Sequence, residues 1–206
     1  MKRNKRIDLV VASRNKKKSA EIKQILKGLK VKITSLCDYP DAPYIAENGR
    51  TFKENAIKKA IKIARFTKKL TLGEDSGLEV TALDGEPGIR SSRFSGKDKS
   101  DLKNNLKLLK ALGDLPLKER KARYICSVAL ADKNGLISVV EGSCSGLIDF
   151  KMRGSFGFGY DPLFMIPKYK RTFAQLGPRI KHKMSHRFRA LSKAKKIIQR
   201  YSSERF

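Results

Sequence analysis

Residues that bind structural metals or form disulfide frameworks are scarce in this chain of 206 residues. It has two histidines, and its three cysteines, Cys37, Cys126 and Cys144, lie at irregular spacings without a CxxC pair. A structural zinc site needs about four such ligands close together, and a disulfide framework needs an even set of cysteines. The sequence therefore favours neither.

Long hydrophobic runs are also lacking. No run of apolar residues approaches the roughly 18 that a membrane-spanning helix needs. The basic start MKRNKR leads into a short apolar segment without a small-residue cleavage signature. We therefore expect a soluble, cytoplasmic protein without a membrane partner. Its 40% hydrophobic content suffices for a sizeable core, so we expect a globular protein of one large or two small domains.

Acidic residues are few: 20 Asp and Glu stand against 47 Lys and Arg, which gives a formal net charge of +27. Such a charge attracts polyanions, including nucleic acids. The lysines, however, are spread through nearly every segment instead of forming one arm. We therefore favour a lysine-biased solvated surface, while nucleic-acid binding is not excluded by the charge.

The first half of the chain is typical of strand-helix units. Residues 7–13 form a run expected of a buried strand, and a second short strand is expected near residues 31–36. Thr51 and Glu54 fit a capping box that opens a helix. The helix expected between the two strands has apolar positions spaced i, i+3, i+4 and i+7, namely Ile22, Ile25, Leu26 and Leu29.

The second half has the pattern of an antiparallel meander. Alternating apolar residues from 124 to 130 lead to Asn134-Gly135, which predicts a hairpin turn, and a third strand is expected near residues 145–150. An apolar stripe over residues 190–201 predicts a C-terminal helix packed against the body. Together the halves predict an α/β or α+β fold with two lobes and a cleft between them.

The stretch TLGEDSGLEV, residues 71–80, places two adjacent acids and a Ser-Gly turn in a strand-like run. At least one of Glu74 and Asp75 must face water, a base or a cation, because burying both in an apolar core would be costly. Carboxylates beside phosphates commonly hold Mg²⁺. A polar turn closed by Ser-Gly explains the same residues, and for the stretch alone we favour this turn because acid-rich turns are common.

Two segments have features of an anion-binding site. Ser13, Asn15 and Lys18 lie between the first strand and the first helix, where backbone N–H groups and the helix dipole attract phosphate. On these residues alone, however, we favour an ordinary strand-helix turn with surface lysines. In KHKMSHR, Ser185 is a good N-cap for the C-terminal helix, and the basic groups around it point to an anion site.

The loop GSFGFGYDP, residues 154–162, interleaves aromatic residues with glycines. Its GxxGxG spacing differs from the dinucleotide-binding fingerprint, and no helix follows directly. Aromatic faces on such a loop could stack on a nucleobase, or the rings could fold back into the core. Both alternatives stay open on spacing alone.

Six segments in order, SRNKKK, AENGRTFKENAIKKA, GEDSGLEV, DGEPGIRSSRFSG, GSFGFGYDPLF and KMSHRFRAL, resemble the inosine triphosphate pyrophosphatase family. The resemblance spans about residues 7–200, and it implies that residues 1–206 form a single domain with two lobes. It implies a two-lobed α/β fold around a long central mixed sheet with flanking helices and an active-site cleft between the lobes. It also implies a homodimer and Mg²⁺-dependent hydrolysis of ITP, dITP and XTP to the monophosphate and pyrophosphate.

The resemblance further implies roles for particular residues. Asp75 resembles the general base, and Glu47, Glu74 and Asp75 the acids at the metal. The residues that resemble substrate contacts are Ser13, Asn15, Lys18 and Lys59 at the triphosphate, Ser76, Phe158 as the stacking ring, and Tyr160, Asp161, Lys181, His186 and Arg187 around the purine.

Two positions depart from the family pattern. Arg14 stands where the family commonly has glycine, so it could contact phosphate or crowd the loop, and Ile180 stands where an acid often precedes the lysine. Two other functions compete with the family's. One is a nucleic-acid-binding module that uses the +27 charge, and the other is a phosphatase that releases orthophosphate instead of pyrophosphate.

Overall fold

The structure is a computed structural model, and it describes residues 6–204. Within these residues the strands are β1 (Ile7–Val11), β2 (Val31–Ser35), β3 (Leu70–Val80), β4 (Lys121–Asp132), β5 (Gly135–Ile148), β6 (Phe164–Ile166) and β7 (Arg171–Thr172). The α-helices are α1 (Lys16–Ile25), α2 (Phe52–Thr67), α3 (Asp101–Leu112), α4 (Phe173–Met184) and α5 (His186–Ser203). Short 3₁₀ turns lie at Leu36–Asp38, Thr81–Leu83, Gly88–Arg93, Leu117–Glu119 and Pro167–Tyr169.

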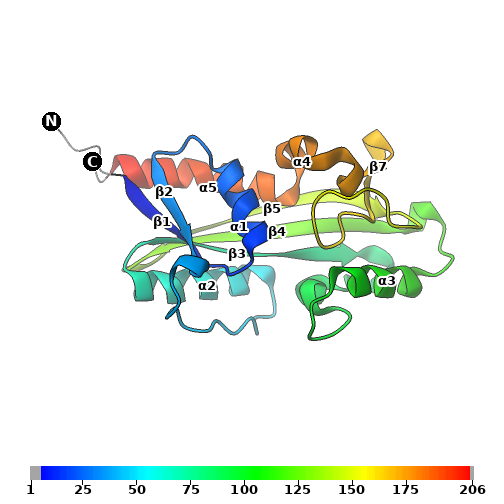
Figure 1. The fold of residues 1–206 in the computed structure, drawn as a ribbon, viewed down its shortest axis with the longest axis horizontal. Helices are drawn as coiled ribbons and strands as arrows, with labels where there is room; N and C mark the ends of the chain where they lie inside the picture. Colours follow the sequence, from blue (N-terminus) through cyan, green and yellow to red (C-terminus); the bar gives the residue numbers. More distant parts are fainter. Residues whose placement is uncertain (1–5, 205–206) are drawn as a thin grey trace. The chain divides into compact units, whose positions relative to one another are not determined.

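The described strands form a mixed sheet in the order β2-β1-β3-β4-β5-β6-β7 (Figure 1). The expected α/β class with flanking helices is confirmed. The chain divides into two compact units, and each is described by itself. Unit 1 comprises the described residues up to Asp75, then Cys126–Gly142 and those from Arg189 onward; unit 2 comprises Ser76–Ile125 and Ser143–Phe188. The cleft expected from the sequence stays a prediction.

Unit 1 begins with three parallel strands. β1 pairs with β2 from Ile7↔Val31 to Val11↔Ser35, and with β3 from Leu9↔Leu70 to Val11↔Leu72. Parallel neighbours need a crossover connection, and α1 and α2 occupy the two connections between these strands. The strand-helix units expected from the sequence are thereby confirmed.

Side-chain alternation sends the strand residues of unit 1 to two different helical layers. Leu9, Leu72 and Val128 pack with residues of α1 and α5, whereas Val10 packs with Ile63 of α2. Figure 1 shows α2 on one face of these strands and α1 and α5 on the other. Successive residues of β3 therefore point toward different helices.

The helix α2 packs very close to β3 because the residues that face each other there, glycine on the strand and alanines on the helix, have little or no side chain. A Cβ atom added to Gly73 would lie 2.2 Å from the carbonyl oxygen of Ala56 and 2.6 Å from the amide nitrogen of Ala60. Only glycine fits there without moving the helix. This contact brings the polar residues of α2 within reach of the strand.

Unit 2 contains the second part of β5, from Ser143 onward, with the antiparallel strands β6 and β7, paired through Leu147↔Met165 and Met165↔Thr172. Its core gathers aromatic rings, with Tyr124 4.6 Å from Phe164 and Phe164 5.2 Å from Phe173 between ring centroids. The helices α3 and α4 belong to this unit. The glycine-rich loop lies between β5 and β6.

Three sequence expectations need correction. The Ser-Gly turn expected after the paired acids is absent from β3, which continues as one strand through Ser76 and Gly77. The strand expected near residues 145–150 is the end of β5, which runs unbroken after a turn at Lys133–Asn134. The helix α4 was not expected, although Thr172 and Gln175 form its capping box.

Candidate functional site

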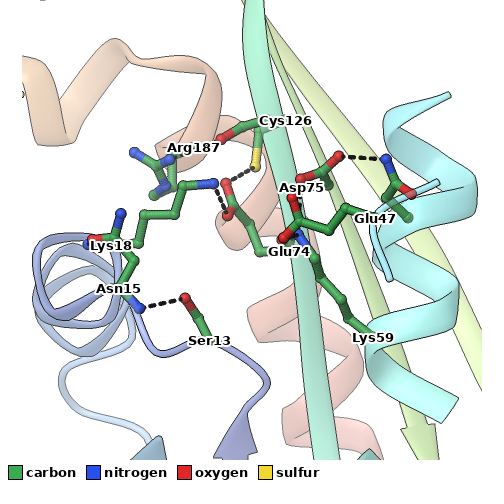
Figure 2. A network of polar contacts seen from close by, with 11 residues as sticks. Ser13, Asn15, Lys18, Glu47, Lys59, Glu74, Asp75, Cys126 and Arg187 are labelled. Atoms are coloured by element: carbon green, nitrogen blue, oxygen red, sulfur yellow. Dashed lines mark hydrogen bonds and ion pairs between the residues drawn. The ribbon is translucent and has the colours of Figure 1, made fainter. Parts of the chain in front are cut away.

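The two adjacent acids of β3 point away from each other. The Glu74 carboxylate meets Lys18 of α1, with 3.0 Å between Oε2 and Nζ. The Asp75 carboxylate meets Lys59 of α2, with 2.8 Å between Oδ1 and Nζ. Figure 2 shows both pairs around the strand. Alternation along a strand thus explains why side-by-side carboxylates can be buried, since each has its own lysine.

Both carboxylate oxygens of Asp75 are held by α2. Lys59 binds Oδ1, and the Asn55 amide donates to Oδ2 at 3.1 Å. Asn55 and Lys59 lie four residues apart, so they share one face of the helix. Lys59 also donates to the main-chain carbonyl of Glu74 at 3.1 Å. The closeness of Gly73 to the helix makes these short contacts possible.

Asn55 also orders the loop that carries Glu47. Its Oδ1 accepts from the amide of Gly49 at 2.8 Å, and Thr51 caps α2 by accepting from the amide of Glu54 at 3.1 Å. Asn55 is not among the site residues expected from the sequence. Its i, i+4 relation to Lys59 was the available signal.

Glu47 and Asp75 converge on a single ammonium group. The Glu47 side chain is 40% exposed, and its Oε1 lies 2.9 Å from Lys59 Nζ. Burial of Lys59 opposes its charged form, but Asp75 and Glu47 outweigh this effect, so the pKa of Lys59 lies above its ordinary value. Lys59 is therefore a permanent positive charge near neutral pH.

The buried Cys126 of β4 completes the surroundings of Glu74. Its thiol donates to Glu74 Oε1 over 3.4 Å, while Lys18 binds the other oxygen. Figure 2 shows the thiol and the ammonium group approaching the carboxylate. The Glu74 side chain is only 1% exposed. Cys126 was expected only as an apolar strand residue, and sequence spacing gave no signal of this contact.

Ser13 and Asn15 form the start of α1. Asn15 is the N-cap, with Oδ1 accepting from the amide of Lys18 at 3.1 Å, and the Asn15 amide donates to Ser13 Oγ at 3.1 Å. Figure 2 shows this loop and Lys18 on the same side of β3. The structure therefore brings Ser13, Asn15 and Lys18 together at a helix N-terminus, where anions bind favourably.

The Arg14 side chain bonds to the segment that follows β2. Its guanidinium donates to the carbonyl oxygens of Leu36, Pro40 and Ala42, at 3.3, 3.4 and 3.1 Å. These contacts fasten the segment after β2 to the first loop. Of the two roles considered for Arg14, contact with phosphate or crowding of the loop, the structure favours neither.

The donor chemistry of Glu47 and Asp75 fits a hard cation such as Mg²⁺. Both carboxylates contact one Nζ atom, so they already meet at a point of positive charge. Glu74 is bonded to Lys18 instead. Within residues 6–204, no group of three Asp, Glu, His or Cys residues is arranged to hold a metal by protein ligands alone. A Mg²⁺ ion there would therefore need ligands from water or phosphate, as is common for this ion.

Unit 2 holds a second group of the expected site residues. Asp161 Oδ2 accepts from Lys181 Nζ at 2.7 Å and from the Phe158 amide at 2.9 Å. Lys181 Nζ lies 4.8 Å from the centroid of the Phe158 ring, and the Arg187 guanidinium carbon lies 5.5 Å from it. Phe158 thus carries two cations near its face. Asp161 supplies the acid that holds Lys181. Lys181 therefore has an acidic partner although position 180, where the family often has an acid, is Ile180.

The other expected site residues of unit 2 also make contacts within this unit. Arg187 Nη2 donates to Ser76 Oγ at 2.9 Å. The His186 ring stacks on Tyr124, with centroids 4.4 Å apart and planes 13° apart, and Ser185 caps α5 by accepting from the amide of Phe188 at 3.2 Å. The N-cap expected at Ser185 is confirmed.

Tyr160 lies in the core of unit 2. Its hydroxyl donates to the Ser91 carbonyl at 2.8 Å, and burial, with the Asp101 charge second, raises its pKa above the ordinary value for tyrosine. Of the two alternatives left open for the aromatic loop, Tyr160 follows the core alternative. Phe158 is half-buried beside the cations. The role of Tyr160 at a purine stays a prediction that rests on the resemblance.

Comparison with known proteins places the chain in a family. Residues 9–197 match the model of the Ham1 family. A dITP/XTP pyrophosphatase of Desulforamulus reducens is 47% identical over 192 residues, which cover 93% of this chain and 96% of that protein. One from Geobacillus kaustophilus is 43% identical over 90% of this chain and 91% of its own length. The chain belongs to the Ham1 family.

A solved structure agrees with this assignment. The HAM1 protein from Coxiella burnetii superposes with a TM-score of 0.85 at 37% identity, covering 94% of this chain and 99% of that one. The expected family resemblance is thereby confirmed. Within residues 6–204, no helix combines the length and the apolar character needed to cross a bilayer.

Proposed function

We propose that this protein hydrolyses non-standard purine nucleoside triphosphates, ITP, dITP and XTP, to the monophosphate and pyrophosphate in the presence of Mg²⁺. Such an activity would remove these nucleotides from the cellular pool. Support comes from Ham1 family membership and from relatives named dITP/XTP pyrophosphatase at 41–47% identity. The observation that carries the proposal is the Asp75 carboxylate fixed between Lys59 and Asn55.

Asp75 is the general base of this proposal. Its two oxygens are oriented by Lys59 and Asn55, and it accepts a proton from the attacking water. The water oxygen bonds to the α-phosphorus, and the bond to the bridging oxygen between the α- and β-phosphates breaks. Pyrophosphate leaves with that oxygen. Positioning and charge dominate the chemistry of phosphates, which suits a carboxylate fixed at both oxygens.

The positive groups of unit 1 bind the triphosphate. Lys18 and Lys59 offset its charge, while Ser13 and Asn15 supply hydrogen bonds at the start of α1. Glu47 and Asp75 would hold Mg²⁺, which supplies positive charge at the reacting phosphate when bound. Glu74, which the resemblance implies as a further acid at the metal, is instead paired with Lys18. Lys59 must then share its carboxylates with the ion.

The polar and aromatic groups of unit 2 bind the purine. Phe158 stacks on the base, and Lys181 and Arg187 donate to its 6-keto edge. Ser76, Asp161 and His186 support these groups, since each contacts Arg187, Lys181 or the core. A 6-amino group cannot accept such hydrogen bonds, so ATP would leave donors unpaired.

The family resemblance also supports a homodimer in the cytoplasm, where its nucleotide substrates occur. Light scattering coupled to size exclusion tests the dimer, and a monomeric mass would remove that part of the proposal. Nucleic-acid binding is a separate possibility raised by the +27 charge. Steep salt dependence of DNA binding by the purified protein would reveal it.

The first experiment separates the products. Purified protein with Mg²⁺ is incubated with ITP, dITP, XTP, ATP and GTP, and pyrophosphate and orthophosphate are assayed independently. Pyrophosphate from the first three nucleotides, with little from ATP or GTP, supports the proposal. Orthophosphate as the primary product would assign the protein to another class of phosphatase. A parallel reaction with EDTA tests the need for Mg²⁺.

A further inference from the structure

The main chain of Gly159 is held at both of its polar groups by the first turns of α3. The Gly159 amide donates to Asp101 Oδ2 at 3.0 Å, and its carbonyl accepts from Asn105 Nδ2 at 2.8 Å. Asp101 and Asn105 lie four residues apart and therefore share one face of the helix. We call these two contacts the Gly159 clamp. It joins α3 to the glycine-rich loop, about 54 residues away along the chain.

The orientation of the Asn105 amide is determined by its surroundings. Nδ2 donates to the Asp101 carbonyl at 2.6 Å as well as to the Gly159 carbonyl. Rotating the amide by 180° would place Oδ1 against two carbonyl oxygens, which repel it. Asn105 is only 2% exposed, so water does not readily replace these bonds. Asn105 is the buried member of the clamp and Asp101 the exposed one.

The clamp acts on the residue next to Phe158. Gly159 has a φ of 63°, in the left-handed region that glycine adopts without strain. On the other side, the Phe158 amide donates to Asp161, which also holds Lys181. The backbone on both sides of the Phe158 ring is thus fixed by named hydrogen bonds. The ring is held in place by a loop that by composition would be free to move.

We propose that Asp101 and Asn105 are positioning residues that set the Phe158 ring for stacking on a purine base. This inference rests on the proposed function. An ordered ring binds its ligand without first losing conformational freedom, so the clamp increases affinity for the base. It does not touch the reacting phosphate groups of the proposed reaction. Its effect therefore falls on KM for a nucleotide and not on kcat.

The neighbouring Asn104 provides a matched control. It is equally buried, accepts from the Ser95 amide at 2.7 Å and donates to the Ser92 carbonyl at 3.2 Å. These contacts hold the end of the 3₁₀ turn Gly88–Arg93 and the residues that follow it, instead of the glycine-rich loop. If Asn105 merely packs α3, the variants Asn104→Leu and Asn105→Leu will have the same effects.

The experiment compares wild type, Asn105→Leu, Asn104→Leu, Asp101→Ala and Asp101→Asn, the last of which keeps a side-chain acceptor. Hydrogen exchange reports on the Gly159 amide, calorimetry reports the Kd of inosine monophosphate, and pyrophosphate release reports KM and kcat for ITP. Inhibition by inorganic tripolyphosphate, which lacks a base, reports phosphate binding alone.

We expect Asn105→Leu to lose Gly159 protection and to raise both the Kd of inosine monophosphate and KM for ITP about 10-fold, a typical stacking contribution. The kcat value and the inhibition constant of tripolyphosphate should change less than about two-fold. Asp101→Ala removes the acceptor of the Gly159 amide, so it should lose Gly159 protection directly, with a smaller rise in Kd and KM because Asp101 is exposed. Asp101→Asn should reverse these changes. Asn104→Leu should leave Gly159 protection and KM unaltered.

Equal effects of the two leucine variants would overturn the inference, as would loss of Gly159 protection without weaker binding of inosine monophosphate. No binding of that ligand to wild type would overturn it as well. Failure of the proposed function has a different signature: wild type binds inosine monophosphate but releases no pyrophosphate from ITP. The Kd and exchange measurements then still decide whether the clamp positions a purine-binding ring.

Discussion

The polar groups of unit 1 and unit 2 are held in place by different means. In unit 1, carboxylates on β3 pair with lysines on α1 and α2, so regular elements set the geometry. In unit 2, Phe158 sits on a loop, and side chains fix it by bonding to the loop's main chain. Buried charges thus depend on helices and strands to hold them in place. An aromatic ring for stacking, in contrast, can lie on a glycine-rich loop if hydrogen bonds fix the main chain of that loop.

The largest effect is expected for Asp75→Asn in unit 1. It removes the proposed base and one negative charge with little change in size, and it should lower kcat about 10²- to 10⁴-fold. Pyrophosphate release from ITP measures this loss, and circular dichroism checks the fold. Asp84→Asn is a control, because Asp84 lies in a turn with positive φ that asparagine tolerates. A near-normal rate in Asp75→Asn would remove Asp75 as the base.

A large effect on stability is expected for Lys59→Met, which leaves Asp75 and Glu47 without their shared ammonium group. Breaking a buried ion pair costs about 3–5 kcal/mol, and water around the exposed Glu47 should reduce this to roughly 2–4 kcal/mol. Urea denaturation measures the change. Lys62→Met, on the same helix, removes only an exposed bond to the Tyr44 carbonyl and should change stability far less.

The same lysine predicts a dependence on pH. Because the folded-state pKa of Lys59 lies above its unfolded value of 10.5, the ion pair stabilises the fold below that pH. Its contribution is lost as pH rises through the folded-state pKa. The stability gap between wild type and Lys59→Met should therefore be constant near neutral pH and narrow above about pH 10.5. A gap that stays constant up to the alkaline limit of folding would contradict the raised pKa.

In unit 2, Phe158→Leu should affect binding more than chemistry. Loss of stacking costs about 1–3 kcal/mol per base, so KM for ITP should rise at least about five-fold while kcat changes little. Phe156→Leu, in the same loop but exposed, should leave KM unchanged. Similar KM values in wild type and Phe158→Leu would show that the loop does not stack on the base.

The smallest effect is expected for Arg14→Gly, which restores the common family residue. It removes three hydrogen bonds, one exposed and two part-buried, to carbonyls of residues 36–42, so the loss should be about 1 kcal/mol and local to that segment. Hydrogen exchange of that segment measures it. Pyrophosphate release should be unaffected. A ten-fold fall in activity would instead place Arg14 among the phosphate contacts.

Much of the fold could be read from local patterns. Thr51 correctly located the start of α2, although only half of the expected capping box forms, because Glu54 accepts from the Arg50 amide instead of the Thr51 amide. The apolar spacing located α1, but the helix ends at Ile25, so Leu26 and Leu29 lie beyond it. The α4 helix was missed because Gly177 and Pro178 interrupt it, and a kink hides helical periodicity. The paired acids suggested a turn because a buried strand rarely carries two charges. The lysines that make this possible come from distant parts of the chain.

The candidate site could be predicted from the sequence only in part, for the same reason. Spacing placed Asn55 and Lys59 on one helix face, but their partner Asp75 depended on how closely α2 packs on β3. In α3 the apolar residues are a poor guide to burial, because Leu102 and Leu106 are 58% and 51% exposed while Asn104 and Asn105 are buried. Hydrophobicity alone does not report hydrogen bonds to a loop that lies far along the chain.

The opposite directions of Glu74 and Asp75 make β3 sensitive to length as well as to composition. Deleting one residue between Leu70 and Gly73 would shift the strand register and exchange the faces of the two acids, even though both remain in the sequence. Glu74 would then face α2, and Asp75 would face α1. Single substitutions in this segment can be tolerated, but deletion of one codon would disrupt both ion pairs at once, because each acid would then face the wrong helix.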